Sequence, residues 1–268
     1  RNQKKANETL MNALFLTVIA GIVLSIVFAG LADTIMRLCG SADETHDMAV
    51  EYFRIIMGCM MFNIISMVIN AAQRGAGNTK IAMYTNTISN LVNIVGNYLL
   101  IGGHCGFPAL GIRGAAIATV FGTVIACAIS ILSLFRKDSF LSLPLILKEK
   151  LWKRLDSVGV ICRLAVSTFV EQVLMRIGFM STSIMAADMG TAALAAHQVG
   201  MNALSLSFSL GDGMQAAAVS LIGQKLGEKK PEQAKACGLL CEKIGIIMAV
   251  AMSAFYLLFG RALYGMFF

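Results

Sequence analysis

Seven long apolar runs dominate this sequence, and they restrict the chain to folds that a lipid bilayer can hold. Each run is long enough to cross about 30 Å of hydrocarbon as a helix. Because lipid offers the backbone no hydrogen-bonding partner, only helices and closed barrels span a membrane, and unbroken runs of this length indicate helices. We therefore expect an all-α integral membrane protein, a polytopic bundle of about seven helices. The runs lie near residues 10–31, 55–72, 81–101, 114–135, 158–187, 192–222 and 237–259.

The charge content supports this fold class. Only 14% of the 268 residues are charged, whereas an average soluble domain has about 25%. The net charge is +7, which in a soluble protein would suggest nucleic acid as a partner. Here basic loops that orient membrane helices account for it, so we expect the lipid bilayer and no nucleic acid among the partners.

The loops between the runs alternate in charge. Loops of one set are strongly basic, whereas those of the other set carry Asp33, Arg37, Asp43, Glu44 and Asp47, then Arg113, and then Asp188. The positive-inside rule places the basic set in the cytoplasm, which predicts a multi-pass protein of the inner or plasma membrane. The basic set contains Lys4, Lys5, Arg74, Lys80, Arg136, Lys137, Lys148, Lys150, Lys153, Arg154, Lys225, Lys229, Lys230 and Lys235.

The longest of these loops divides the chain. It contains Pro144, several basic residues and the only tryptophan, Trp152. We interpret it as a basic amphipathic segment on the cytoplasmic membrane face. The predicted domains are thus 1–135 and 158–268, with 136–157 as the segment between them.

Polar side chains form stripes on two of the predicted helices. In the third run Asn86, Asn90, Asn93 and Asn97 are spaced four, three and four residues apart, which places them on one helix face. A single Asn is well explained by a hydrogen bond between helices, but four in one stripe favour a cavity. The sixth run repeats the pattern with Gln198, Asn202, Ser205, Ser209 and Asp212.

The fifth run carries a carboxylate well inside the predicted membrane span. Glu171 has Ser167 on its own face, and Gln172 and Arg176 form a neighbouring strip. A carboxylate within a membrane must be protonated, paired or bound to a cation. Arg176 is five residues from Glu171 and is poorly placed to pair with it on one helix, although it could pair with another helix. We interpret Glu171 as a ligand of a coupling ion or substrate.

Four segments resemble the multidrug and toxic compound extrusion (MATE) family, in that family's order along the chain. They read AAQRGAGNTK at 71–80, NYLLIG with GFPALGIRGAAIAT between 97 and 119, MGTAALAAHQ at 189–198 and LIGQKLG at 221–227. The resemblance implies twelve helices in two six-helix lobes. This chain would be a fragment that holds about helices three to nine, with three to six in 1–135 and seven to nine in 158–268.

The resemblance also implies a function. MATE proteins are secondary active antiporters that export organic, often cationic, compounds by alternating access while Na⁺ or H⁺ enters. No other cofactor, no catalytic residue and no enzyme activity is then expected, and the protein would be a monomer. Glu171 matches the seventh-helix Glu that helps bind the cation, so the resemblance implies the coupling ion there, either Na⁺ or H⁺. Asn93 and Asn97 stand where some members carry an Asn and an acid for a proton site, and the acid is absent here.

Two rival functions fit the sequence less well. A flippase for a lipid-linked precursor would favour several cationic residues in its cavity, and Arg176 is the one strong candidate. A membrane-embedded transferase would need clustered Asp for Mg²⁺–diphosphate, or a His–Asp pair at the interface. The sequence shows neither pattern.

Overall fold

The computed structural model describes residues 3–38, 43–136, 140–148 and 157–265. These residues form helices and their connections, and no strand occurs among them. The chain divides into two compact units, an N-terminal unit of Asn2–Val158 and a C-terminal unit of Gly159–Phe268. The boundary between these units falls beside the predicted connecting segment 136–157; the assignment of each unit to a six-helix lobe stays a prediction.

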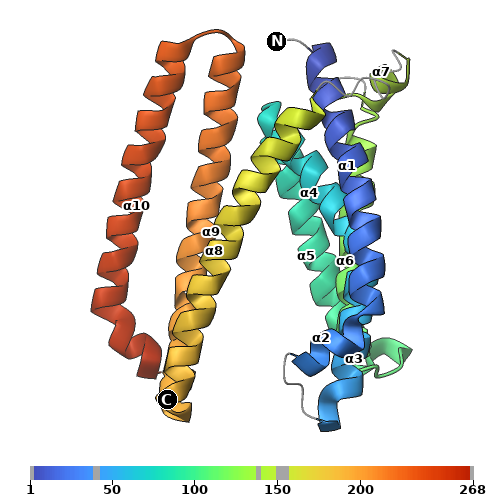
Figure 1. The fold of residues 1–268 in the computed structure, drawn as a ribbon, viewed down its shortest axis with the longest axis vertical. Coiled ribbons are helices and arrows are strands. Elements are labelled where there is room, and N and C mark those ends of the chain that lie inside the picture. The colour runs from blue at the N-terminus through green and yellow to red at the C-terminus, as the bar shows by residue number, and fades with distance from the viewer. Residues whose placement is uncertain (1–2, 39–42, 137–139, 149–156, 266–268) are drawn as a thin grey trace. The chain divides into compact units, whose positions relative to one another are not determined.

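The N-terminal unit is a bundle of long helices with short ones at its ends (Figure 1). Helix α1 packs on α3 and α4, and α6 packs on α3, α4 and α5. Its helices are α1 (Gln3–Gly30), α2 (Ala32–Leu38), α3 (Asp43–Gly58), α4 (Met60–Gly75), α5 (Thr79–Gly102), the 3₁₀ turn η1 (His104–Gly106), α6 (Ile112–Ser133) and α7 (Leu143–Lys148).

The described part of the C-terminal unit, up to residue 265, forms three long helices. They are α8 (Val158–Asp188), α9 (Thr191–Gly227) and α10 (Pro231–Gly265). Helices α9 and α10 pack as an antiparallel hairpin across a short turn at Glu228–Lys230 (Figure 1). Gly190, at φ 107°, allows the turn between α8 and α9.

Each of the seven predicted spans coincides with a long helix or helix pair, which confirms the fold class. Among the described residues, four helices are long and apolar enough to cross a membrane: α1, α6, α8 and α10. The pair α3–α4, bent by 43°, makes a fifth if it is one span. Helices α5 and α9 are outside this set, and they are the two that carry the polar stripes, whose amide and hydroxyl groups lower the hydropathy.

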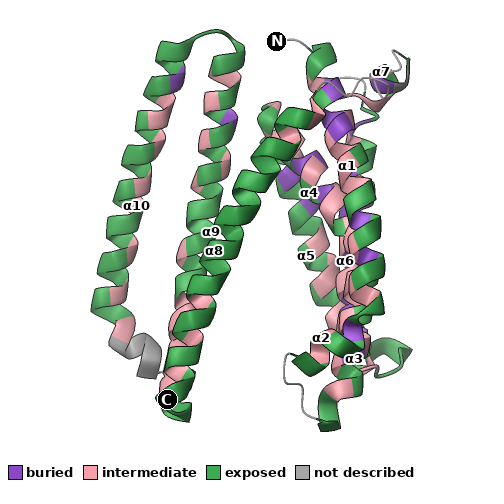
Figure 2. Ribbon diagram, viewed as in Figure 1, coloured by how far each residue is buried: buried purple, intermediate pink, exposed green. Residues whose placement is uncertain are grey.

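The core of the N-terminal unit lies at the end where α1 begins and α6 ends (Figure 2). Leu10, Ile69, Leu134, Leu141 and Ile146 form its buried apolar cluster. Two of these residues belong to the predicted connecting segment. The described part of that segment, 140–148, is therefore part of a packed core, whereas we had expected it to lie on the membrane face. Trp152 and its basic neighbours lie outside the described residues.

Glycines bring α5 and α6 into close contact. A Cβ built on Gly114 would lie 2.5 Å from the carbonyl oxygen of Leu100, and one on Gly96 would lie 2.9 Å from the Ala118 methyl. Close approach of helices through small residues is the usual way in which membrane helices pack. The contact fixes the rotation of α5 about its axis, and hence the direction of its Asn stripe.

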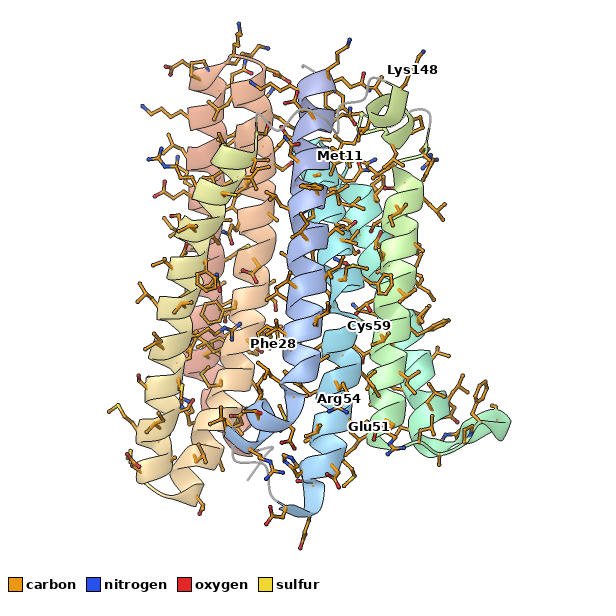
Figure 3. The ribbon with its side chains drawn as sticks, turned by 45° about the vertical axis from the view of Figure 1, so that its right-hand side comes forward. Met11, Phe28, Glu51, Arg54, Cys59 and Lys148 are labelled. Carbon is orange, nitrogen blue, oxygen red and sulfur yellow. The ribbon has the colours of Figure 1, made fainter. Side chains whose placement is uncertain are left out.

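The segment 71–80 forms the tight turn between α4 and α5. The backbone N–H of Asn78 donates to the carbonyl of Gln73 at 2.8 Å, and Gly77 adopts φ 95°, which favours glycine. The turn brings Arg74 and Lys80 to the end of the unit where Lys148 lies. Glu51 and Arg54, on α3, lie toward the opposite end (Figure 3), where Glu51 pairs with Arg113 of α6.

The helices of the C-terminal unit bury few of their own side chains. Among the residues with described side chains from 159 to 260, only Ser220 and Ala234 are buried (Figure 2). Large apolar side chains such as Leu257, Met185 and Ile247 are more than 60% exposed. Surfaces of this kind suit contact with lipid or with further protein.

Candidate functional site

A cavity of about 370 Å³ lies between α8 and α9, and its lining is part polar and part aromatic. Helix α8 contributes a strip at spacings of three and four residues, and α9 contributes residues between Met201 and Asp212, among them the last three of its polar stripe, Ser205, Ser209 and Asp212. The lining residues are Gln172, Met175, Arg176, Phe179, Met201, Leu204, Ser205, Phe208, Ser209 and Asp212.

The polar side of the cavity can accept hydrogen bonds and positive charge. Ser205 Oγ donates to the Asn202 carbonyl at 2.7 Å, and Ser209 Oγ donates to the Ser205 carbonyl at 3.0 Å. Because both hydroxyl protons are used within α9, the oxygen lone pairs are left to accept from a ligand. One turn further along, Asp212 adds a carboxylate to the same lining.

Among the described residues, the side-chain contacts between α8 and α9 include an aromatic pair and a hydrogen bond. The rings of Phe179 and Phe208 meet edge to face, with centroids 5.8 Å apart and an angle of 87°, a favourable aromatic geometry. One turn beyond Phe179, Ser183 Oγ lies 3.2 Å from His197 Nε2. The two phenylalanines and the two methionines give the cavity its apolar wall.

The predicted residues of these two helices are only partly brought together. Gln172, Arg176 and Asp212 line the cavity, and no ion pair joins the last two among the described side chains. Glu171 is exposed and lies about 100° around α8 from Gln172, since successive helical residues differ by that angle. Gln198 and Asn202 are exposed on α9, outside the cavity lining.

The Asn stripe of α5 divides into two pairs. Asn93 Nδ2 donates to Thr119 Oγ1 of α6 at 3.0 Å, and Asn97 Nδ2 donates to Asn93 Oδ1 at 3.0 Å. Asn86 and Asn90 are exposed. The hydrogen-bonding alternative thus accounts for Asn93, whereas Asn97 Oδ1 is buried and has no hydrogen-bond partner among the described residues.

Sequence reasoning did not single out several residues at these positions. Thr119 was one, because nothing in α6 marks which of its hydroxyls meets α5. The aromatic pair Phe179 and Phe208 was another, although each lies three residues from a predicted polar residue, at Arg176 and Ser205. That spacing would have placed both on the cavity face.

A second cavity of about 330 Å³ lies on the α10 side of α9. Met214, Met248 and Met252 line it. Tyr256 closes one end, because its hydroxyl donates to the Ala203 carbonyl at 2.6 Å and accepts from Ser207 at 3.1 Å. Methionines thus line both cavities of the C-terminal unit.

Comparison with protein families decides the family. The family model described as MatE matches residues 1–99 and 168–267, which is more than half of the chain. This chain belongs to the MatE family. The predicted resemblance is confirmed.

The curated relatives of this MatE chain are named as multidrug resistance proteins. A probable multidrug resistance protein NorM of Thermotoga maritima is 30% identical over 228 residues, which cover 84% of this chain and 48% of the relative. A probable NorM of Bacillus cereus is 27% identical over 265 residues, which cover 96% and 55%. The chain spans about half the length of the curated relatives it matches.

Solved structures share the fold of this MatE chain. A MATE protein crystallised in complex with MaL6 matches with a TM-score of 0.86 at 23% identity, over 98% of this chain and 57% of the other. A MOP superfamily transporter from Pyrococcus furiosus, described as having a binding pocket of reverse polarity, matches with a TM-score of 0.80 at 22% identity, over 98% and 57%. At these identities the likeness concerns the fold.

Proposed function

We propose that the protein works as a secondary active antiporter that exports organic, often cationic, compounds across the inner or plasma membrane in exchange for Na⁺ or H⁺. Membership of the MatE family and relatives named for multidrug resistance support this function. Related folds are described in inward-facing and outward-facing conformations, which is consistent with alternating access. In this proposal the protein is a monomer with two lobes, to which 1–135 and 158–268 belong, and these lobes rock against each other, with 136–157 as the segment between them.

The α8–α9 cavity carries the substrate part of the proposal. It joins one carboxylate, Asp212, to a wall of aromatic and thioether side chains. An organic cation would place its charge beside Asp212 and its apolar body against Phe179 and Phe208, where aromatic faces attract cations. Met175 and Met201 can adapt to ligands of different shape, as a broad export range requires.

Arg176 has a defined place in this cavity. It lines the same space as Asp212, so its positive charge competes with a cationic substrate for the carboxylate. When the substrate leaves, the guanidinium is available to balance the charge of Asp212, which keeps the empty cavity from holding an isolated charge. Gln172, one turn away, supplies an amide that can donate or accept.

We propose a separate role for Glu171 as the ligand of the coupling ion. It is an acid within the span of α8, but it lies on a different face from the cavity lining. Glu171 belongs to α8, and Asp212 belongs to α9 and lines a cavity with α8. A coupling ion bound at Glu171 and a substrate bound at Asp212 would therefore have linked affinities, because both depend on the conformation of α8 and α9. Asn90, Asn93 and Asn97, with Gln198 and Asn202, are proposed as further polar ligands along the transport route.

Efflux measurements test the substrate site. The protein at its full natural length would be expressed in drug-sensitive bacteria, and efflux of a fluorescent organic cation would be followed for wild type, Asp212→Asn, Glu171→Gln and Asp188→Asn. Asp188 ends α8 outside the cavity and is the matched control. Asp212 is exposed, and charges in a partly solvated site interact by about 1–4 kcal/mol, so we expect Asp212→Asn to weaken substrate affinity about tenfold while Asp188→Asn does not.

The outcomes separate the two acids. If Glu171→Gln abolishes the dependence of efflux on an ion gradient but leaves binding of the organic cation intact, the divided roles are supported. Efflux by the wild type driven by a Na⁺ gradient or by an H⁺ gradient then identifies the coupling ion. Efflux at the wild-type rate in Asp212→Asn, at equal membrane expression, would rule out the proposed substrate site. If the wild type moves lipid-linked anionic precursors and no organic cation, the flippase alternative replaces the antiporter.

A further inference from the structure

A groove of about 450 Å³ lies between the start of α5 and the end of α6, and the proposed transport function does not use it. It belongs to the N-terminal unit, at the end that the loop charges predict to be cytoplasmic. Its lining residues are Ile81, Tyr84, Ile129, Leu132, Ser133, Phe135 and Arg136.

The groove exists because the close contact of α5 and α6 ends before it. The tight glycine contacts lie farther along, at Gly96, Gly114 and Gly122. Toward the start of α5 the facing residues are the larger Ile81 and Tyr84, and toward the end of α6 they are Leu132 and Phe135. Large side chains hold the helix ends apart and leave a space that is open to the outside.

The walls of the groove are apolar and remain exposed. Tyr84 is 57% exposed, Leu132 66% and Phe135 50%. In water such a patch would be costly, but within a bilayer it matches hydrocarbon chains. Tyr84 adds an aromatic ring with a polar end, the kind of side chain that gathers at the membrane interface.

The mouth of the groove is basic. Arg136 is exposed, and no acidic partner for it occurs among the described residues. Lys80 lies one turn before Tyr84 on α5 and lines an adjoining cavity of about 400 Å³ with Gln73, Asn78 and Thr79. The two cavities are linked by one hydrogen bond, from Gln73 Nε2 to Ser133 Oγ at 3.1 Å.

The first turn of α5 adds further donors at this mouth. Its N-cap, Asn78, makes no side-chain capping bond, so the first backbone N–H groups of the helix are open to an anion. Positive charge, hydroxyl and amide donors thus lie at one end of the space, and apolar side chains lie along it.

We propose that this groove binds an acidic phospholipid, with its phosphodiester between Arg136 and Lys80 and an acyl chain along Ile81, Ile129 and Leu132. Basic pockets between membrane helices on the cytoplasmic side are suited to acidic headgroups. Two cations would repel the cationic compounds of the proposed transport function, so the groove is not a second drug site. A free phosphate ion would leave the apolar wall unused. The inference holds whichever compound the protein exports.

Lipid binding to the purified protein tests the proposal. The protein at its full natural length would be titrated in detergent with phosphatidylglycerol, phosphatidylcholine or inorganic phosphate, and bound lipid would be counted by native mass spectrometry. Each basic residue is worth about fivefold in affinity for an acidic lipid surface. We therefore expect Arg136→Gln with Lys80→Gln to weaken phosphatidylglycerol binding about 30-fold, while Lys235→Gln, which removes an exposed charge from α10, leaves it unchanged.

A second readout locates the lipid. Phosphatidylglycerol with a photoreactive acyl chain should crosslink to peptides that contain residues 79–84 or 129–136. Equal binding of phosphatidylcholine, equal occupancy by phosphate alone, or an unchanged affinity in the double variant would each overturn the proposal. Absence of crosslinks from these peptides would do so too, since it would mean that another part of the protein covers the groove.

Discussion

The side-chain oxygen of Asn7 accepts a hydrogen bond from the backbone N–H of Ser142 at 2.8 Å, across 135 positions of sequence. Its amide nitrogen donates to the carbonyls of Gln3 at 2.9 Å and Phe140 at 3.2 Å. Asn7 is fully buried, so these bonds are shielded from water. They anchor the segment after α6 to the first turns of α1, and Leu141 and Ile146 are buried as a result.

Replacing Asn7 by alanine should therefore destabilise the N-terminal unit. The substitution leaves the Ser142 N–H and the Phe140 carbonyl without this partner, and a buried unsatisfied polar group costs about 1–3 kcal/mol. We expect a lower midpoint of thermal unfolding for the detergent-purified protein. Gln3→Ala is the control, because Gln3 also donates to the Phe140 carbonyl, at 3.0 Å, but in an exposed position. A loss no larger for Asn7→Ala than for Gln3→Ala would contradict the anchoring role.

Gly114 should tolerate no side chain. A methyl group there would come within 2.5 Å of the backbone of Leu100, and backbone cannot move aside as a flexible side chain can. We expect Gly114→Ala to destabilise the protein by about 1–3 kcal/mol, the usual cost of overpacking. Gly30→Ala, at the end of α1 with nothing within 4 Å of the added carbon, should be neutral. Melting curves of both variants check this. Equal stability of Gly114→Ala and Gly30→Ala would mean that α6 does not lie close to α5 where Gly114 meets Leu100.

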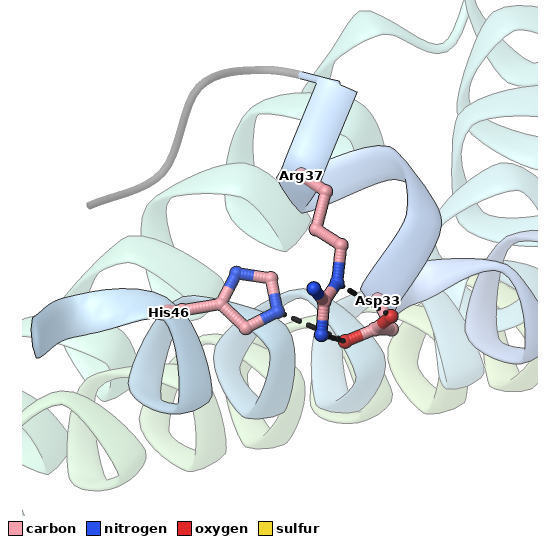
Figure 4. A network of polar contacts seen from close by, with 3 residues as sticks. All are labelled: Asp33, Arg37 and His46. Atoms are coloured by element: carbon pink, nitrogen blue, oxygen red, sulfur yellow. Dashed lines mark hydrogen bonds and ion pairs between the residues drawn. The ribbon is translucent and has the colours of Figure 1, made fainter. Parts of the chain in front are cut away.

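The ion-pair network of Asp33, Arg37 and His46 should give the α2–α3 contact a defined pH dependence (Figure 4). His46 Nε2 lies 2.9 Å from Asp33 Oδ1, and Arg37 Nε donates to Asp33 Oδ2 at 3.0 Å. The hydrogen bond with His46, and next that with Arg37, hold the pKa of Asp33 below its ordinary value. A lowered carboxyl pKa contributes stability that is present above the ordinary value of about 3.9 and is lost as pH falls through the folded value.

The measurement is the difference in thermal stability between wild type and Asp33→Asn as a function of pH. The difference should shrink as pH falls from the ordinary carboxyl pKa of about 3.9 through the lower folded value. Asp47→Asn removes a nearby exposed acid and should show no such change. A wild-type advantage over Asp33→Asn that grows on acidification would reverse the predicted sign.

Removal of the Arg176 charge should tune the substrate range. Arg176→Gln frees Asp212 from a competing cation, and charges in a partly solvated site interact by about 1–4 kcal/mol. We expect the apparent affinity for a monovalent organic cation to rise about fivefold or more, and that for a compound with an added carboxylate to fall. Arg163→Gln, on the same helix but outside the cavity, is the control. Transport assays with such a matched pair of compounds would refute the idea if both affinities moved alike.

Much of this protein could be predicted from periodicity. Apolar run lengths predicted helices at the positions where α1, α5 and α6 now lie, because lipid leaves the backbone no alternative to internal hydrogen bonds. The four-three spacing likewise placed Gln172 with Arg176, and Ser205 with Ser209 and Asp212, on single helix faces. These are properties of one helix at a time, so the sequence by itself determined them.

Only the tertiary structure decided which other part of the molecule each helix face contacts. Glu171 and Gln172 are adjacent in sequence, yet the rotation of α8 against α9 gives the cavity to Gln172 and leaves Glu171 outside it. The same holds for Asn93, whose partner Thr119 depends on how Gly114 seats α6 against α5, and for Asn7, whose bond to Ser142 joins distant segments. A helical repeat fixes the angles between side chains about one axis, whereas packing sets how that axis is turned toward the next. That turn depends on contacts between residues far apart in the chain, which no local pattern contains.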